Sequence, residues 1–101
     1  MSYYLVFNYD VTDPEMLGQY QQKAGKISPD QFGLKALVVD HEPKDIEGKS
    51  GQMLVILEFE SEAAAMAFYN SPEYQDIVNL RVNASKVWVR GAPQFTVPPG
   101  E

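Results

Sequence analysis

Aromatic, aliphatic and β-branched residues concentrate in four short segments of the chain. These segments are residues 3–9, 34–39, 53–59 and 86–90, and Gly91 follows the last of them. Such residues favour strands, and polar or glycine-containing stretches separate the four segments. The pattern therefore predicts four β-strands.

A wider spacing of apolar residues predicts a helix between the first two strands. Thr12 or Asp13 can cap its free N–H groups, and Pro14 suits its first turn. Apolar side chains then recur every three or four positions, at Leu17, Tyr20, Ala24 and Ile27. We expect Ser28-Pro29-Asp30 to end this helix.

A second helical region is predicted between the third and fourth strands. Ser61 caps a helix over residues 62–70, and Ser71-Pro72 begins a further helical segment with the same capping chemistry. Along one side of that segment lie Tyr74, Ile77, Val78 and Arg81. The order is β-α-β-β-α-β, which predicts a ferredoxin-like α+β fold, a four-stranded antiparallel sheet with its helices on one face.

The predicted strands are apolar at both odd and even positions. Residues 5–7, 37–39, 54–57 and 87–89 show this directly. A sheet that packs on one face alone would alternate apolar and polar residues. We therefore expect the helices to bury one face and the sheet of a second copy to bury the other, giving a homodimer. The alternative is an open face that tolerates Tyr, Met and Trp side chains, but a patch of that size is rare on a monomer.

Length and charge narrow the class of protein further. The chain has 101 residues, 14 acidic and 8 basic, and a formal net charge of −6. We expect one domain over residues 1–92 and an extended tail over residues 93–101. Nucleic acid is not expected as a partner, because phosphate binding needs a basic surface. No apolar segment approaches the ~20 residues of a membrane helix, so we do not expect the protein to associate with a membrane. We expect a cytoplasmic location.

Several segments of the chain resemble a known family. They are Asp10-Val11-Thr12-Asp13-Pro14-Glu15 with Tyr20, Ile46-Glu47-Gly48, Val55-Ile56-Leu57-Glu58-Phe59-Glu60-Ser61, Phe68-Tyr69-Asn70-Ser71-Pro72-Glu73-Tyr74-Gln75 and Arg81. Over about residues 3–91 the chain is similar to the family of domain of unknown function 1330. The resemblance implies the dimeric α/β-barrel superfamily, in which two ferredoxin-like sheets pack face to face.

The resemblance implies no single reaction. The superfamily includes cofactor-free monooxygenases, isomerases, haem-dependent enzymes and proteins without known chemistry, and fold alone does not fix function. In many members of the family, the segment after the second strand resembles Arg-Gly-Gly. This chain has Val39-Asp40-His41 at that place. No role of that arginine carries over, and whether the chain is an enzyme is left open.

His41 is the single histidine of the chain and a candidate catalytic residue. Flanked by Asp40 and Glu42, it could act as a general base or a polar anchor at the mouth of a sheet–helix cleft. The alternative is a surface histidine near a hairpin. One histidine without any cysteine predicts no metal site, and we expect no cofactor; a haem would have His41 as its one histidine ligand.

Arg81 is a candidate ligand-binding residue. A guanidinium matches a carboxylate bidentately, and Arg81 lies seven residues after Tyr74, hence on a similar helix face. Tyr20, Tyr69 and Tyr74 are candidates to line the same site with phenol groups. The alternatives are an ion pair of Arg81 with a residue such as Glu58, and tyrosines that belong to the core.

These observations lead to two main hypotheses of function, and a third is a relative of haem-handling proteins or monooxygenases. The first is a small-molecule-binding protein, or a cofactor-free enzyme, that holds a small carboxylate or aromatic ligand between the sheet and the helices. The second is a non-catalytic structural or regulatory dimer in which Arg81 and the tyrosines have structural roles.

Overall fold

A computed structural model describes residues 1–27, 29–49 and 51–97. Its elements are β1 (Tyr3–Val11), α1 (Pro14–Ala24), α2 (Pro29–Phe32), β2 (Lys35–Asp40), β3 (Met53–Phe59), α3 (Glu62–Tyr69), α4 (Pro72–Gln75), α5 (Val78–Ala84) and β4 (Ser85–Pro93). The predicted β-α-β-β-α-β order is confirmed, with each helical region divided into shorter helices.

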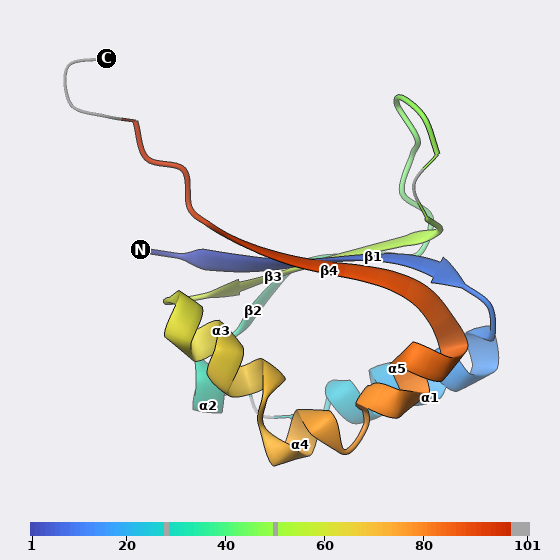
Figure 1. The fold of residues 1–101 in the computed structure, drawn as a ribbon, viewed down its shortest axis with the longest axis horizontal. Helices are drawn as coiled ribbons and strands as arrows, with labels where there is room; N and C mark the ends of the chain where they lie inside the picture. Colours follow the sequence, from blue (N-terminus) through green and yellow to red (C-terminus); the bar gives the residue numbers. More distant parts are fainter. Residues whose placement is uncertain (28, 50, 98–101) are drawn as a thin grey trace.

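The strands form one antiparallel sheet in the order β2-β3-β1-β4. The helices pack together on one face of this sheet (Figure 1). The side chains of Leu5, Phe7 and Tyr9 on β1 point toward the helices, and all three are buried. The register sets Val55 of β3 and Val89 of β4 on either side of Phe7, so the core lies between this face and the helices. The predicted ferredoxin-like fold is confirmed.

Three helices begin at the residues that the sequence marks as caps. Asp13 and Ser61 each accept a hydrogen bond from a backbone N–H three residues later, at 3.1 Å. The Ser71 hydroxyl accepts from the backbone N–H of Tyr74 at 3.2 Å and donates to the carbonyl of Phe68 at 2.7 Å. A cap is worth about 1 kcal/mol, and here Ser71 also fixes where Tyr74 lies.

The ends of three predicted elements differ from the structure by two residues or more, and one of them is β1, which runs to Val11 rather than ending at residue 9. Helix α1 ends at Ala24, and Ile27 packs against the core from the turn that follows. Strand β4 continues past Gly91 to Pro93, because β1 pairs with it along its whole length. A Cβ atom at position 91 would lie 2.6 Å from the hydroxyl of Tyr3, so the glycine makes room for that ring. Ser28 of the expected helix end, and residues 98–101 of the expected tail, lie outside the described residues.

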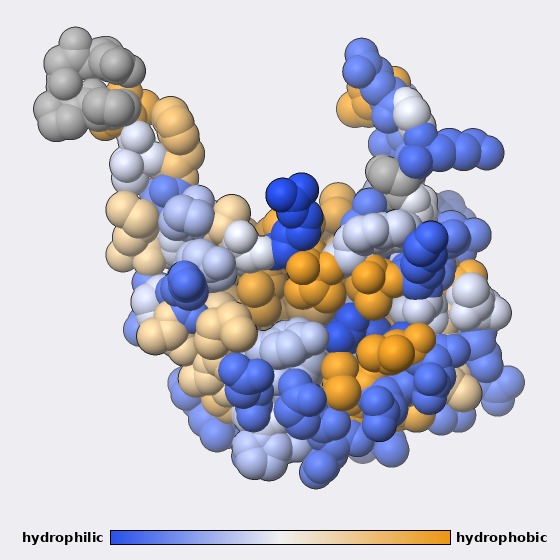
Figure 2. Space-filling model, in the orientation of Figure 1, coloured by the Kyte–Doolittle hydropathy of each residue, from blue (hydrophilic) through white to orange (hydrophobic). Residues whose placement is uncertain are grey.

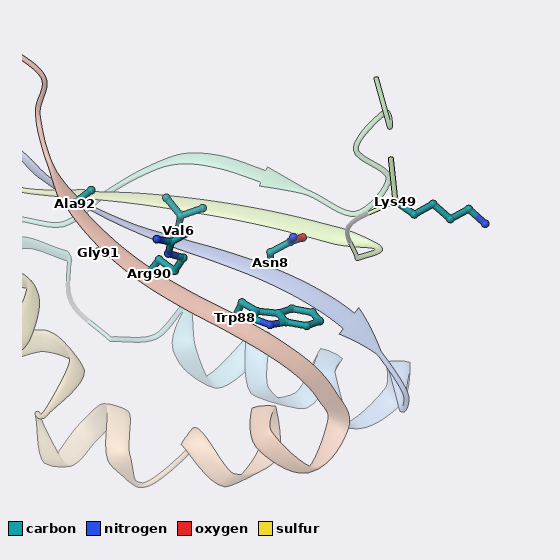
Figure 3. Close-up of a pocket in the computed structure, with 7 residues that line it drawn as sticks. All are labelled: Val6, Asn8, Lys49, Trp88, Arg90, Gly91 and Ala92. Carbon is teal, nitrogen blue, oxygen red and sulfur yellow. The ribbon is translucent and has the colours of Figure 1, made fainter. Parts of the chain in front are cut away.

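The face of the sheet without helices is called the free face below. Its side chains are Tyr4, Val6, Asn8, Asp10, Lys35, Val38, Asp40, Leu54, Ile56, Glu58, Lys86, Trp88, Arg90 and Ala92. The centre is apolar, and Trp88 is 47% exposed. An open groove of about 640 Å³ crosses it, lined by Val6, Asn8, Trp88 and Arg90 with Lys49 at its end (Figure 3).

Two segments project beyond the free face. One is the connection between β2 and β3, and the other is the chain that follows β4 (Figure 1). The space-filling view shows the same two projections with apolar side chains between them (Figure 2). Ile46 in the first segment and Phe95 in the second are 87% and 81% exposed. Among the described residues, no helix is long and apolar enough to span a bilayer.

Candidate ligand-binding site

A cavity of about 220 Å³ lies between the sheet and helix α1. The strands contribute Phe7, Met53 and Val55, and the helix and the turn after it contribute Ala24 and Ile27. Val39 of the edge strand β2 also lines the cavity and is 53% exposed, so the cavity reaches the surface beside β2 (the edge at the far side of the sheet from β4).

Three tyrosines and Gln21 give this apolar cavity its polar groups. Tyr9 of β1, Tyr20 of α1 and Tyr74 of α4 line it, and all three are buried. The hydroxyls of Tyr20 and Tyr74 share a hydrogen bond of 2.6 Å. The hydroxyls of Tyr9 and Tyr20 also interact, so the three linked phenols use two of their three hydroxyl hydrogens between themselves. The three phenols can therefore present one O–H donor to a molecule in the cavity.

Arg81 lies beside the tyrosines and is 2% exposed. Its Nη2 donates to the hydroxyl of Tyr69 at 3.4 Å, and its Cζ lies 5.8 Å from the ring centre of Phe7. Its Nε is buried and has no hydrogen-bond acceptor within the described part of the chain. A buried charge is normally paired, because losing hydration costs several kcal/mol. Arg81 is thus a buried cation whose surroundings are phenols and a benzene ring.

The phenols do not neutralise this charge. Burial raises the pKa of Tyr74, Tyr20 and Tyr9 well above the usual value of about 10, and the opposing effect of Arg81 is smaller. For Arg81, burial lowers the pKa, but the phenol groups of Tyr74, Tyr20, Tyr9 and Tyr69 together raise it by more. At neutral pH the cluster is therefore a charged guanidinium among neutral hydroxyls.

These shifts predict that stability falls in alkaline solution. Tyrosines of the unfolded chain lose their protons near pH 10, whereas the buried ones keep theirs to higher pH. Above about pH 10 the folded state binds more protons than the unfolded state, so the free energy of unfolding decreases as pH rises. At lower pH these tyrosines are protonated in both states, so they do not make the free energy of unfolding depend on pH. Urea unfolding at about pH 8 and about pH 11 measures the effect. Absorbance at the tyrosinate band is the control, and ionisation of all 6 tyrosines near pH 10 in the native protein would contradict the expectation.

The structure brings together four of the five residues named from the sequence. Tyr20 and Tyr74 line the cavity, while Tyr69 and Arg81 lie next to them and do not line it. Arg81 therefore stands behind the tyrosines rather than at the cavity wall. His41 is exposed in the turn after β2 and is not a lining residue, so its catalytic role stays a prediction separate from this site.

Glu58 does not pair with Arg81. It lies on the free face, opposite Lys35 of β2, whereas Arg81 lies on the helix side. The charged groups that act most strongly on the pKa of Arg81 are phenols and not carboxylates. Nor do three or more His, Asp or Glu side chains gather there as a possible metal site.

Sequence reasoning missed Tyr9 and Phe7 as members of the site. Both lie at odd positions of β1 together with Leu5, and this shared parity places them on one face. Parity alone does not say which face the helices cover. The signal was therefore present but could not be assigned to the cavity.

Solved structures with the same architecture define the class of protein. A protein of unknown function from Rhodopseudomonas palustris has a TM-score of 0.73 at 15% identity, over 95% of this chain and 84% of that chain. A dimeric ferredoxin-like protein of unknown function from Jannaschia sp. CCS1 has a TM-score of 0.71 at 16% identity, over 93% and 100%. A candidate antibiotic biosynthesis monooxygenase from Chloroflexus aurantiacus J-10-fl has a TM-score of 0.64 at 16% identity, over 97% of each. At these identities the likeness establishes a ferredoxin-like fold.

The family follows from the sequence itself. The profile described as domain of unknown function (DUF1330) matches residues 2–91, and the chain belongs to this family. The resemblance seen in the sequence motifs is thereby confirmed. No curated protein matches the chain at a significant level.

Proposed function

We propose that the protein binds a small, largely apolar organic acid in the cavity between the sheet and α1. The observation that carries this proposal is the buried Arg81, a cation without a carboxylate among its described neighbours, beside an apolar cavity. A ligand anion would supply the missing negative charge.

The cavity limits the ligand in size and polarity. At about 220 Å³ it is smaller than the roughly 300–1,000 Å³ typical of drug-sized ligand sites, so a ligand of about ten non-hydrogen atoms suits it. The ligand's apolar part would contact Met53 and Val55 of the sheet and Ile27 of the turn after α1. Its acidic group would accept the remaining O–H of the three linked tyrosines.

In this arrangement Arg81 acts through its field and through the tyrosines. A positive charge in a poorly hydrated site stabilises a nearby anion more strongly than the same charge in water. The cavity lining described by the structure contains neither a carboxylate nor an imidazole that could take up a proton. The site therefore suits a binding protein, or a cofactor-free enzyme in which the ligand supplies its own reactivity. A cytoplasmic location is part of the proposal.

Calorimetric titration with matched ligands tests the proposal. Benzoate and phenylacetate should bind the parent, and their neutral amides should bind at least about tenfold more weakly, since a tenfold change is worth about 1.4 kcal/mol. Arg81→Met should remove the preference for the acids. Lys23→Met is the matched control, because it removes one positive charge from the exposed end of α1. Equal binding of acids and amides, unchanged binding by Arg81→Met, or no binding of either acid would each count against the proposal.

We also propose that two copies associate through their free faces. Three basic and three acidic side chains occupy this face, namely Lys35, Lys86, Arg90, Asp10, Asp40 and Glu58. The face is therefore neutral, and the net charge of −6 belongs to the rest of the chain. A neutral face with an apolar centre can meet a second copy without the repulsion that two acidic molecules otherwise have. Similar solved structures are described as dimeric, which supports the proposal.

The mass of the protein in solution tests the association. At about micromolar concentration the parent should have twice the mass of one chain, and Ile56→Asp in the centre of the free face should reduce it to one. Val82→Asp is the control, because Val82 is an exposed apolar residue on α5 at 54% exposure. A parent of single-chain mass would refute the homodimer.

A further inference from the structure

Strand pairing determines which charged side chains of the free face lie opposite each other. Lys86 of β4 lies opposite Asp10 of β1, and Lys35 of β2 lies opposite Glu58 of β3. Opposite charges across a strand pair stabilise each other. Four of the six charges on this face therefore lie opposite a charge of the other sign within their own sheet.

The remaining two charges have apolar cross-strand neighbours. Arg90 of β4 lies opposite Val6, and Asp40 of β2 lies opposite Leu54. Both residues are exposed. Asp40 accepts one hydrogen bond, from the backbone N–H of Glu42 at 2.9 Å, which leaves its charge without a cation across the strand. One positive and one negative charge without an opposite charge across the strand pair thus lie on the two edge strands, β4 and β2, of the same face.

The positions of these two charges select one way of pairing two copies. A two-fold axis parallel to the strands places β4 of each copy over β2 of the other. The register then sets Arg90 over Val38 of the other copy, because Val6, Ile56 and Val38 continue the row of Arg90 across the sheet. Asp40 lies two residues from Val38, a distance of roughly 7 Å along a strand that an arginine side chain can span.

The other face-to-face arrangement places like charges together. A two-fold axis across the strands would put β4 over β4, and the Lys86 and Arg90 side chains of both copies would then meet. Like charges placed against each other across an interface cost several kcal/mol. Electrostatics therefore favours the arrangement that crosses the two edges.

We propose that two copies pair with β4 of each over β2 of the other, so that Arg90 forms an ion pair with the partner subunit's Asp40, twice in each dimer. This inference rests on the proposed homodimer. It adds to it the direction of the two-fold axis and the contact that fixes it.

Charge-reversal variants test the ion pair, with the dissociation constant measured by sedimentation. Arg90→Asp and Asp40→Arg should each raise the dissociation constant of the dimer by about tenfold or more, and the double variant should restore most of the parent affinity. Asp40→Asn is a second variant, because an asparagine oxygen can still accept the N–H of Glu42 while the charge is lost. It should weaken the dimer as well.

The helix side of the molecule supplies the control. Glu73→Arg on α4 changes the charge by the same amount as Asp40→Arg, at an exposed position remote from the free face, and should leave dissociation unchanged. If the parent is a monomer, the proposed homodimer and this inference fail together. If the parent is a dimer, and the single variants dissociate like the parent or the double variant is not rescued, the homodimer stands and the ion pair is refuted.

Discussion

An Arg81→Met variant is expected to be more stable than the parent, by about 1–4 kcal/mol in the free energy of unfolding. Arg81 is 2% exposed and its Nε has no acceptor among the described residues. Methionine fills much of the same space without a charge to desolvate. The variant loses the 3.4 Å hydrogen bond to Tyr69 and the contact with the Phe7 ring, each worth about 1 kcal/mol. The loss of the desolvation cost exceeds both.

Urea unfolding at fixed protein concentration measures this gain, because association changes apparent stability. Arg81→Lys is the control, since it keeps a buried charge and should show no gain. A lower stability of Arg81→Met would mean that the guanidinium is a structural group, as in the hypothesis of a non-catalytic dimer. A gain in stability combined with lost binding of benzoate would show that the protein holds an unfavourable charge for the sake of its ligand.

A Phe68→Ala variant is expected to lose about 3–5 kcal/mol of unfolding free energy. Phe68 of α3 is 4% exposed, and its ring centre lies 4.7 Å from that of Tyr74 and 5.5 Å from that of Phe59. Phe32 of α2 meets the same ring edge-on at 5.6 Å. One side chain therefore joins α2, α4 and β3 to α3. Truncation would leave a void where these elements meet.

Met66→Ala is the matched control for this variant. Met66 belongs to the same helix and is 43% exposed, so its truncation should change the unfolding free energy by about 0.5 kcal/mol or less. Urea denaturation followed by the fluorescence of Trp88, the single tryptophan, reports on both variants. A loss below about 1 kcal/mol for Phe68→Ala would contradict the central place of this ring in the core.

Local features of the sequence predicted most of the fold. Asp13, Ser61 and Ser71 begin helices because a capping hydrogen bond depends on residues only three positions away. The strands were located by composition, and apolar residues at both parities identified a sheet with two apolar faces. Where the prediction was wrong, at the end of β4, pairing with a distant strand carried the chain past Gly91.

The candidate site was harder to predict because it is assembled from separate elements. Helical spacing placed Tyr74 and Arg81 on one side of the chain, and this part could be derived from sequence alone. The hydroxyls of Tyr20 and Tyr74 lie 2.6 Å apart only because α1 packs near α4. No local sequence pattern contains that packing. The position of Arg81 behind the tyrosines, rather than at the cavity wall, likewise follows only from tertiary packing.

The edge of the sheet at β2 has a further consequence. Its pairing with β3 shifts register between Ala36 and Val38, and Leu37 at the shift is 51% exposed. A regular edge strand offers an unbroken row of N–H and C=O groups to which further strands can add without limit, as in fibrils. A bulge breaks that row. Contact through the faces, in contrast, is complete once two copies have met. The irregular edge therefore favours a finite assembly over an open-ended filament, even though apolar side chains are exposed there.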